Sequence, residues 1–324
     1  MHTLEQLQKR AIEIIDAQNY LAEPLSLYEP IDYGMRQGGK RIRPLLCLIA
    51  AELCGGEMEK AEPAAVAVEM LHNFTLLHDD IMDCSPLRRG KPTVFRKYDQ
   101  NKAILSGDAM FACAFKYLLQ CDKEVIPQLT ETLTRGAIEV CEGQGFDMDF
   151  ENRQTVSTDE YLQMIKLKTG VLLSTALRLG AITAKADEKT LNLLDTFGKY
   201  IGIAFQIKDD MLDCWSDLDT FGKVCGADII DRKKTFLYIT ALESATQTQR
   251  QELLSLYENT TLDKDEKIQK VRAIYEQLSV AQKAQKAVEE YNSKAFEALE
   301  QIEVAPQRKA TLIEVAKKLI NRNK

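Results

Sequence analysis

The chain has 324 residues, of which 45% are hydrophobic and 28% charged, and its formal net charge is −7. These proportions exclude a disordered chain, and the acidic balance argues against a general nucleic-acid binder. No apolar run approaches the roughly 18 residues that a membrane-spanning helix needs, so we expect no membrane span.

Apolar residues recur at helical spacing through most of the chain. An amphipathic segment opens it at residues 1–10, and Thr158 has the character of a helix start. In chain order, the spacing predicts helices over residues 45–53, 64–82, 103–119, 161–182, 191–212, 229–242, 267–278, 281–299 and 311–320. No linker of low complexity divides them. We therefore expect one all-α domain over residues 1–324, built as a single large helical bundle.

Two copies of one acidic pattern, D-D-x-x-D, lie in apolar surroundings at residues 79–83 and 209–213. On a helix, positions i and i+4 share a face, so each copy projects two carboxylates side by side with a third close by. A solvated acidic patch is the simplest alternative, but repelling carboxylates beside buried surface are costly unless something neutralises them. Mg²⁺ prefers such oxygen ligands and is usually held together with substrate phosphates. The candidate metal ligands are Asp79, Asp80, Asp83, Asp209, Asp210 and Asp213.

Basic residues recur near the acidic motifs and could bind a second phosphate group. Residues 38–44 read Gly-Gly-Lys-Arg-Ile-Arg-Pro, in which Gly39 allows close backbone approach while Lys40 and Arg43 supply donors for phosphate oxygens. The other candidates are Arg88 and Arg89, which follow the first motif, and Lys168, Lys223 and Lys233. A solvated basic face is the alternative for each pair taken alone.

The histidines separate two further alternatives. His72 lies two helical turns before Asp79, either as a core histidine or as a phosphate donor, and His78 precedes Asp79 directly. A metal-dependent phosphohydrolase would need several histidine ligands, whereas the chain has three histidines. No nucleophile elbow, Walker loop or dinucleotide fingerprint is present, and no histidine is placed as a general base. These features favour a reaction in which metal-bound diphosphate is the leaving group.

The cysteines indicate the redox compartment in which the protein is expected to fold. The chain has eight of them without a C-x-x-C pair, and they lie in apolar helical contexts. We expect buried free thiols in a protein of the reducing cytoplasm.

In this order, the motifs resemble those of the trans-isoprenyl diphosphate synthases, or polyprenyl synthetases. The resemblance includes residues 38–44, the acidic motif with Arg88-Arg89-Gly90, Ser106-Gly107-Asp108, Glu142-Gly143-Gln144, Lys168-Thr169-Gly170, Phe205-Gln206, the second acidic motif, Phe221-Gly222-Lys223 and Lys233-Lys234-Thr235. Two positions depart from the family pattern, because Ser216 and Arg232 stand where the family often has glycine. Both lie beside the expected ligands, so they bear on rate or loop geometry.

The resemblance implies an all-α bundle of the isoprenoid synthase type around a deep central cavity, usually a homodimer. It implies three Mg²⁺ ions held by Asp79, Asp83 and Asp209 on an allylic diphosphate. The further contacts of that substrate would be Arg88, Lys168, Thr169, Gln206, Lys223 and Lys233. Isopentenyl diphosphate would bind at Gly39, Lys40, Arg43, His72 and Arg89. The implied reaction is a head-to-tail 1′-4 condensation.

Product length is expected to depend on residues one turn or so before the first acidic motif. In the family an aromatic residue near there closes the pocket, and here Phe74 and Thr75 occupy those positions. Phe74 as ordinary core, or Leu71 and Phe111 as the floor, are the alternatives. We expect a short C15 or C20 product. A medium- or long-chain synthase, a terpene cyclase and a non-catalytic partner subunit are alternative functions.

Overall fold

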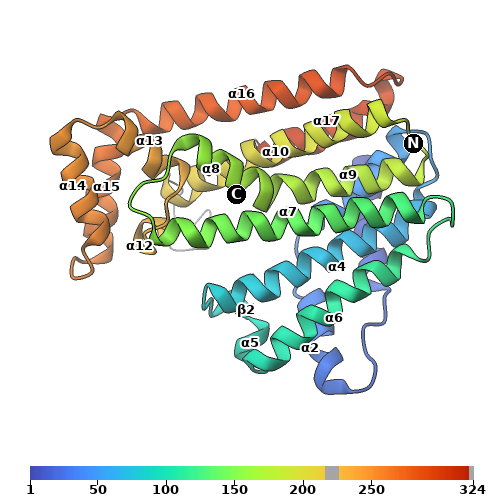
Figure 1. Cartoon of the computed structure of the whole chain (residues 1–324). Coiled ribbons are helices and arrows are strands. Elements are labelled where there is room, and N and C mark those ends of the chain that lie inside the picture. The colour runs from blue at the N-terminus through green and yellow to red at the C-terminus, as the bar shows by residue number, and fades with distance from the viewer. Residues whose placement is uncertain (216–225, 321–324) are drawn as a thin grey trace. The chain divides into compact units, whose positions relative to one another are not determined.

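The computed structural model describes residues 1–215 and 226–320, and within these ranges it is almost entirely α-helical (Figure 1). The strands described there are β1 (Leu87–Arg88) and β2 (Lys91–Pro92), which form one short antiparallel hairpin. The all-α prediction is confirmed. The chain divides into two compact units, each composed of several segments, and the prediction of a single domain stays a prediction.

The first unit comprises residues 1–138, 172–195 and 301–315. Its helix α4 (Met58–Met82) packs against α3 (Ile42–Leu53) and α6 (Gln100–Leu118), and most of its buried residues are small or branched apolar ones. The complete elements of this unit, besides the hairpin, are α1 (Leu4–Asp16), α2 (Leu25–Met35), α3 (Ile42–Leu53), α4 (Met58–Met82), α5 (Val94–Lys97) and α6 (Gln100–Leu118).

The second unit comprises residues 139–171, 196–300 and 316–324, of which the last four lie outside the described residues. Helices α14 and α15 lie side by side, and α15 also packs against α16 (Figure 1). The complete elements of this unit are α8 (Thr158–Ile165), the π-helical turn η1 (Lys166–Gly170), α12 (Ala227–Ile230), α13 (Phe236–Ser244), α14 (Gln247–Glu258), α15 (Lys264–Gln277) and α16 (Val280–Glu300).

Four helices contribute residues to both units. They are α7 (Ile126–Asn152), α9 (Val171–Thr183), α10 (Glu188–Trp215) and α17 (Pro306–Ile320). Helix α8 begins where the sequence indicates, because Ser157 accepts a hydrogen bond from the backbone N–H of Glu160 while the Glu160 side chain caps Ser157 in return.

Three differences from the predicted elements affect the functional residues. Helix α7 has no counterpart in the prediction. The predicted helix at 229–242 is wrong, because Arg232 takes a left-handed conformation (φ 57°) and the Thr235 side chain caps a new helix start. The predicted helix at 161–182 is interrupted by η1.

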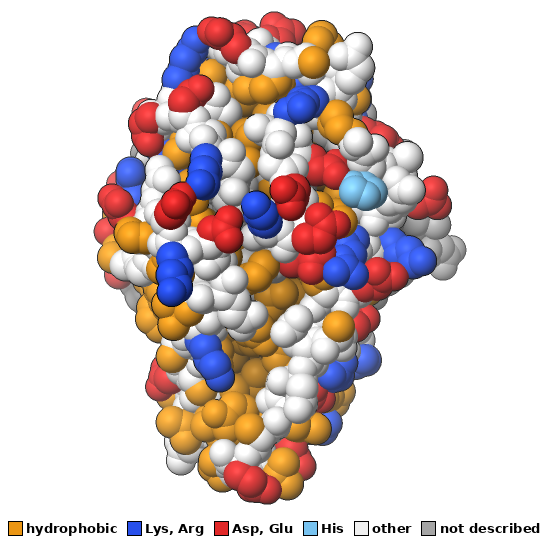
Figure 2. Space-filling model, turned by 90° about the vertical axis from the view of Figure 1, so that its right-hand side faces the viewer, with side chains coloured by type: hydrophobic (Ala, Val, Ile, Leu, Met, Phe, Trp, Pro, Cys, Tyr) orange, Lys and Arg blue, Asp and Glu red, His pale blue; other side chains and the backbone are white. Residues whose placement is uncertain are grey.

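On the face shown in Figure 2, acidic and basic side chains are interspersed over the upper half, and hydrophobic side chains gather in the lower half. Across the described ranges, no helix combines the length and the apolar character needed to cross a bilayer.

The seven described cysteines form no disulfide. Cys84 and Cys141 are exposed, so the expectation of buried thiols is wrong for these two.

Candidate active site

The first acidic motif forms the C-terminal turn of α4. Asp79 is half-buried and Asp83 is exposed at the helix cap, whereas Asp80 is buried. The Arg88 side chain on β1 donates to Asp80 Oδ1 through Nε at 2.8 Å and Nη2 at 2.7 Å. Burial raises the pKa of Asp80, and the bonds from Arg88 oppose that rise. The middle aspartate is therefore already bound by the protein, and Arg88 is engaged with it.

A basic cluster lies in the same unit. The Arg43 Nε is buried without a hydrogen-bond partner, and burial lowers the pKa of this guanidinium to about 10. Burial, followed by the charges of Arg43 and Arg89, lowers the pKa of His72 well below its ordinary value. Arg89 Nη1 donates to the Gly38 carbonyl, and the guanidinium lies against Gly39, where a Cβ would collide with it. Cations gathered with an unsatisfied donor indicate a place for an anion.

Beneath this cluster lies an ion pair that sequence reasoning missed. Arg41 Nη1 donates to Glu69 Oε1 at 2.7 Å, and both side chains are only 3% exposed. Asn73 Nδ2 donates to the same carboxylate oxygen at 3.4 Å, and Arg41 Nη2 donates to the Met35 carbonyl. Arg41 therefore acts as an internal support for α3 and α4, while the neighbouring Lys40 is exposed.

The second acidic motif lies on α10, in the second unit. Asp209 and Asp213 are half-buried, whereas Asp210 is buried and accepts three hydrogen bonds. The donors are Tyr161 O–H at 2.6 Å, the Phe236 N–H at 3.1 Å and Gln206 Nε2 at 3.2 Å. Burial, followed by the charge of Asp228, raises the pKa of Asp210. The middle aspartate of each motif is thus bound inside the protein.

Tyr161 is also a residue that sequence reasoning missed, because its partner Asp210 lies 49 residues away along the chain. The Tyr161→Phe variant loses the O–H donor to Asp210, and we expect its free energy of unfolding to fall by about 1–3 kcal/mol. Urea denaturation of Tyr257→Phe provides the control, since it removes only a neutral hydroxyl pair with Tyr275 at 2.7 Å. If the free energy of unfolding falls no further in Tyr161→Phe than in Tyr257→Phe, the bond to Asp210 has no special strength.

The remaining polar candidates of this unit meet near η1. Lys168 Nζ donates to Asp147 Oδ2 at 2.5 Å, and Thr169 Oγ1 donates to Gln206 Oε1 at 3.1 Å. Asp147, on α7, has no local signal in the sequence. Lys233 is more exposed, with its Nζ 3.8 Å from Asp228 Oδ1. Ser216 and Lys223 lie outside the described residues.

Aromatic rings gather on α4 and α6, one turn or more before the first acidic motif. The Phe74 ring lies edge-on to His78 at 4.8 Å and to Phe111 at 5.4 Å between centroids, and Phe111 contacts Phe115 at 5.3 Å. The Thr75 hydroxyl donates to the His72 carbonyl at 2.8 Å and is therefore occupied within its own helix.

The carboxylates of the two acidic motifs are the candidate donors for a metal ion. Over residues 1–215 and 226–320, no group of three or more His, Cys, Asp or Glu side chains is arranged to hold a metal ion. Each motif still offers carboxylates outside the buried aspartate, and Mg²⁺ is commonly held by one or two carboxylates plus substrate phosphates. The donor set therefore fits Mg²⁺ that arrives with a diphosphate.

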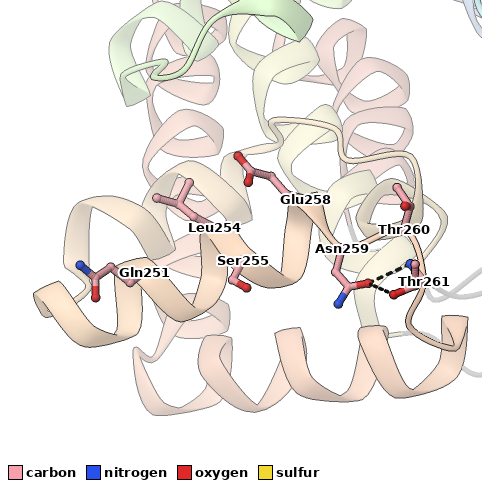
Figure 3. A pocket seen from close by; sticks show the side chains of 7 residues that line it. All are labelled: Gln251, Leu254, Ser255, Glu258, Asn259, Thr260 and Thr261. Atoms are coloured by element: carbon pink, nitrogen blue, oxygen red, sulfur yellow. Dashed lines mark hydrogen bonds between the residues drawn. The ribbon is translucent and has the colours of Figure 1, made fainter.

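A separate pocket lies on α14 and the loop after it (Figure 3). Its lining residues are Gln251, Leu254, Ser255, Glu258, Asn259, Thr260 and Thr261. The Asn259 side-chain oxygen Oδ1 accepts hydrogen bonds from the backbone N–H and the hydroxyl of Thr261, at 2.8 and 3.0 Å. This pocket contains no predicted site residue and no cationic side chain, so it is not the candidate site.

Comparison with known proteins relates this geometry to characterised relatives. Residues 24–278 match the family model described as "Polyprenyl synthetase". The chain is 39% identical to the geranylgeranyl diphosphate synthase of Methanosarcina mazei over 76% of this chain and 78% of that protein. It is 42% identical to the geranylgeranyl diphosphate synthase of Sulfolobus acidocaldarius over 74% of each chain. A crystal structure of a geranylgeranyl pyrophosphate synthase matches with a TM-score of 0.95 at 43% identity, over 100% of both chains.

Proposed function

The chain belongs to the polyprenyl synthetase family and is a prenyltransferase, and from that premise we propose how its residues carry the reaction. It joins isopentenyl diphosphate to an allylic diphosphate, head to tail (1′-4), in a magnesium-dependent reaction that yields a short-chain trans-prenyl diphosphate. We assign the allylic diphosphate to the two acidic motifs and isopentenyl diphosphate to the basic cluster. The single observation that carries this division is the buried, unsatisfied Arg43 Nε, in a cluster with His72 and Arg89.

The acidic motifs supply the allylic site. We propose that Asp79 and Asp83 of the first motif, with Asp209 of the second, hold three Mg²⁺ ions. Asp80 and Asp210 are proposed to position these ligand carboxylates through their own bonds inside the protein. When bound, the metal neutralises the charge that develops on the leaving diphosphate. Arg88, Lys168, Thr169, Gln206, Lys223 and Lys233 are proposed to contact the same substrate.

The basic cluster supplies the second site. Arg43, Arg89 and Lys40 bind the diphosphate of isopentenyl diphosphate through charge-assisted hydrogen bonds. Burial and the neighbouring arginines lower the pKa of His72, which favours the neutral imidazole with one N–H donor and no added charge. No protein base is assigned to the final proton transfer, because the released diphosphate can accept the proton.

The functional assignment is tested by incubating the protein with Mg²⁺, isopentenyl diphosphate and dimethylallyl, geranyl or farnesyl diphosphate. We expect elongated diphosphates, detected by mass, with C20 as the longest abundant product. Omission of Mg²⁺ serves as the control and should abolish elongation. Lack of elongation with every primer, in protein that remains folded, would contradict the assignment and favour a cyclase or a partner-dependent subunit.

We propose C20 rather than C15 as the product, since the relatives compared above are named geranylgeranyl synthases. The aromatic cluster around Phe74 supports a closed pocket beside α4. One turn of α4 advances ~5.4 Å, which is comparable with one extended isoprene unit.

The Phe74→Ala variant removes the proposed floor, and its main product should lengthen by at least one isoprene unit. Product masses would be compared with those of Phe95→Ala, which loses an aromatic ring on α5 that packs against the Arg96 guanidinium. If Phe74→Ala gives the wild-type distribution, the floor lies elsewhere, with Phe111 and Leu71 as the next candidates.

A homodimer and a cytoplasmic location are also proposed. The exposed face of α6 supports association, because Leu105 is 59% exposed and Ile104 is 39% exposed on that helix. Sedimentation of the purified protein tests the dimer, and a monomeric mass at assay concentration would contradict it.

A further inference from the structure

The π-helical turn η1 joins α8 to α9 and contains both Lys168 and Thr169. Its closing hydrogen bond runs from the Val171 N–H to the Lys166 carbonyl, five residues back, in place of the four-residue bond of an α-helix. Such turns are rare and frequently occur at functional sites.

The side chains of η1 bond to helices on two sides. Lys168 Nζ donates to Asp147 Oδ2 on α7 at 2.5 Å. Thr169 Oγ1 donates to Gln206 Oε1 on α10 at 3.1 Å. The Lys168–Asp147 pair is only partly exposed, at 27% and 41%.

A glycine lies four residues before each of these partners, on the same helix face. A Cβ on Gly143 would approach the backbone nitrogen and Cα of Lys168 closer than 3.0 Å, nearer than real Cβ atoms come. A Cβ on Gly202 would approach the Cα of Gly170 equally closely. Because glycine is a poor helix former, its place inside α7 and α10 requires a reason, and this close approach of backbones provides it.

We propose that the Gly143–Asp147 face of α7 and the Gly202–Gln206 face of α10 together position Lys168 and Thr169. On each face, the glycine admits the π turn and the residue one helical turn later holds its side chain. Gly143, Asp147 and Gly202 are positioning residues, whereas Gln206 is also a proposed contact of the substrate. The inference rests on the proposed contacts of Lys168 and Thr169 with the allylic diphosphate. The orientation of these side chains affects the rate strongly, because a small misplacement of a group that contacts the substrate slows the reaction.

Gly143→Ala is the direct test, and Gly145→Ala is its matched control. Gly145 lies on the same helix, is exposed, and a Cβ there meets nothing within 4 Å. For Gly143→Ala we expect kcat/KM for the allylic diphosphate to fall about 10-fold or more, with the KM for isopentenyl diphosphate within about twofold of wild type. Gly145→Ala should match wild type in both constants.

The same two substitutions in a Lys168→Ala background separate positioning from general damage. If Gly143 acts through Lys168, adding Gly143→Ala there should lower kcat/KM by less than about threefold. An equal loss in both backgrounds, or wild-type kinetics in Gly143→Ala, would overturn the inference. Wild-type kinetics in Lys168→Ala alone would instead contradict the proposed contact of Lys168 with substrate.

Asp147→Asn decides the matter if Gly143→Ala does not fold. It keeps the helix packing, and Asp149→Asn on the exposed side of α7 is its control. We expect Asp147→Asn to lower kcat/KM for the allylic diphosphate by about threefold or more, because Lys168 loses its orienting partner. A value equal to that of Asp149→Asn, or a higher one, would show that α7 does not position Lys168.

Discussion

Replacing Asp209 with alanine should lower kcat/KM for the allylic diphosphate by about 10²–10³-fold, as loss of one preorganised electrostatic group does in other enzymes. Asp209 is half-buried on α10, and its carboxylate is proposed to hold metal on the substrate. Steady-state kinetics at saturating Mg²⁺ measure the effect. The thermal unfolding midpoint of the protein without Mg²⁺ should fall less than in Asp210→Ala, because Asp210 is the buried aspartate and accepts three hydrogen bonds.

Asp210→Ala is the informative contrast. It leaves the Tyr161 hydroxyl, the Phe236 N–H and the Gln206 amide without their acceptor, so we expect a lower unfolding midpoint as well as lower activity. Glu252→Ala, on the exposed side of α14, controls for loss of an acidic residue. If Asp209→Ala retains wild-type activity, or loses activity only by unfolding, the proposed division between Asp209 and Asp210 is wrong.

Arg41→Ala should lower the free energy of unfolding by about 3–5 kcal/mol, the usual effect of removing one partner of a buried ion pair. The substitution removes the 2.7 Å bond to the buried Glu69 carboxylate, which keeps the long bond from Asn73 and the nearby charges of Arg43 and Arg89. Urea denaturation of the protein without substrates measures the change. Loss of the Arg41 bond to the Met35 carbonyl adds to the effect, because that acceptor also lies in the interior.

A double variant distinguishes charge from packing. In Arg41→Met/Glu69→Met both charges are removed together, and we expect it to be more stable than Arg41→Ala, since apolar replacement of a buried pair is often close to neutral. The surface pair of Lys9 and Glu13 is the control, and Lys9→Ala should cost less than about 1 kcal/mol. A small effect for Arg41→Ala would mean that the pair is not a support for α3 and α4.

Much of the fold is readable from the sequence where helical spacing is regular and a cap is local. The start of α8 at Ser157 and Glu160 is such a case. Helix α7 was missed because exposed apolar residues such as Ile138 and Phe146 blur its buried stripe. The break before α13 was missed because apolar spacing continues across it, while a left-handed Arg232 interrupts the backbone.

The residues of the candidate site also differ in how far the sequence alone predicts their roles. The acidic motifs and basic runs are local patterns of charge, so their positions could be predicted. The different environments of Asp79 and Asp80 could not, because they depend on Arg88 folding back from β1. Tyr161 and Asp147 carry no signal of their own, since their partners come from distant parts of the chain. The distinction between ligand and support is thus a tertiary property.

The π turn also makes chain length part of the site. A π turn contains one residue more than the α-helical turn it replaces, so it is equivalent to a single-residue insertion between α8 and α9. Deleting one residue from 166–170 would let these helices fuse in regular α-helical register. Because the wider turn absorbs the extra residue, the helices on either side would keep nearly the same orientation after the deletion. A natural or engineered variant with a one-residue gap here would keep its helix, yet lose the wide turn that presents Lys168 to Asp147 on α7 and Thr169 to Gln206 on α10.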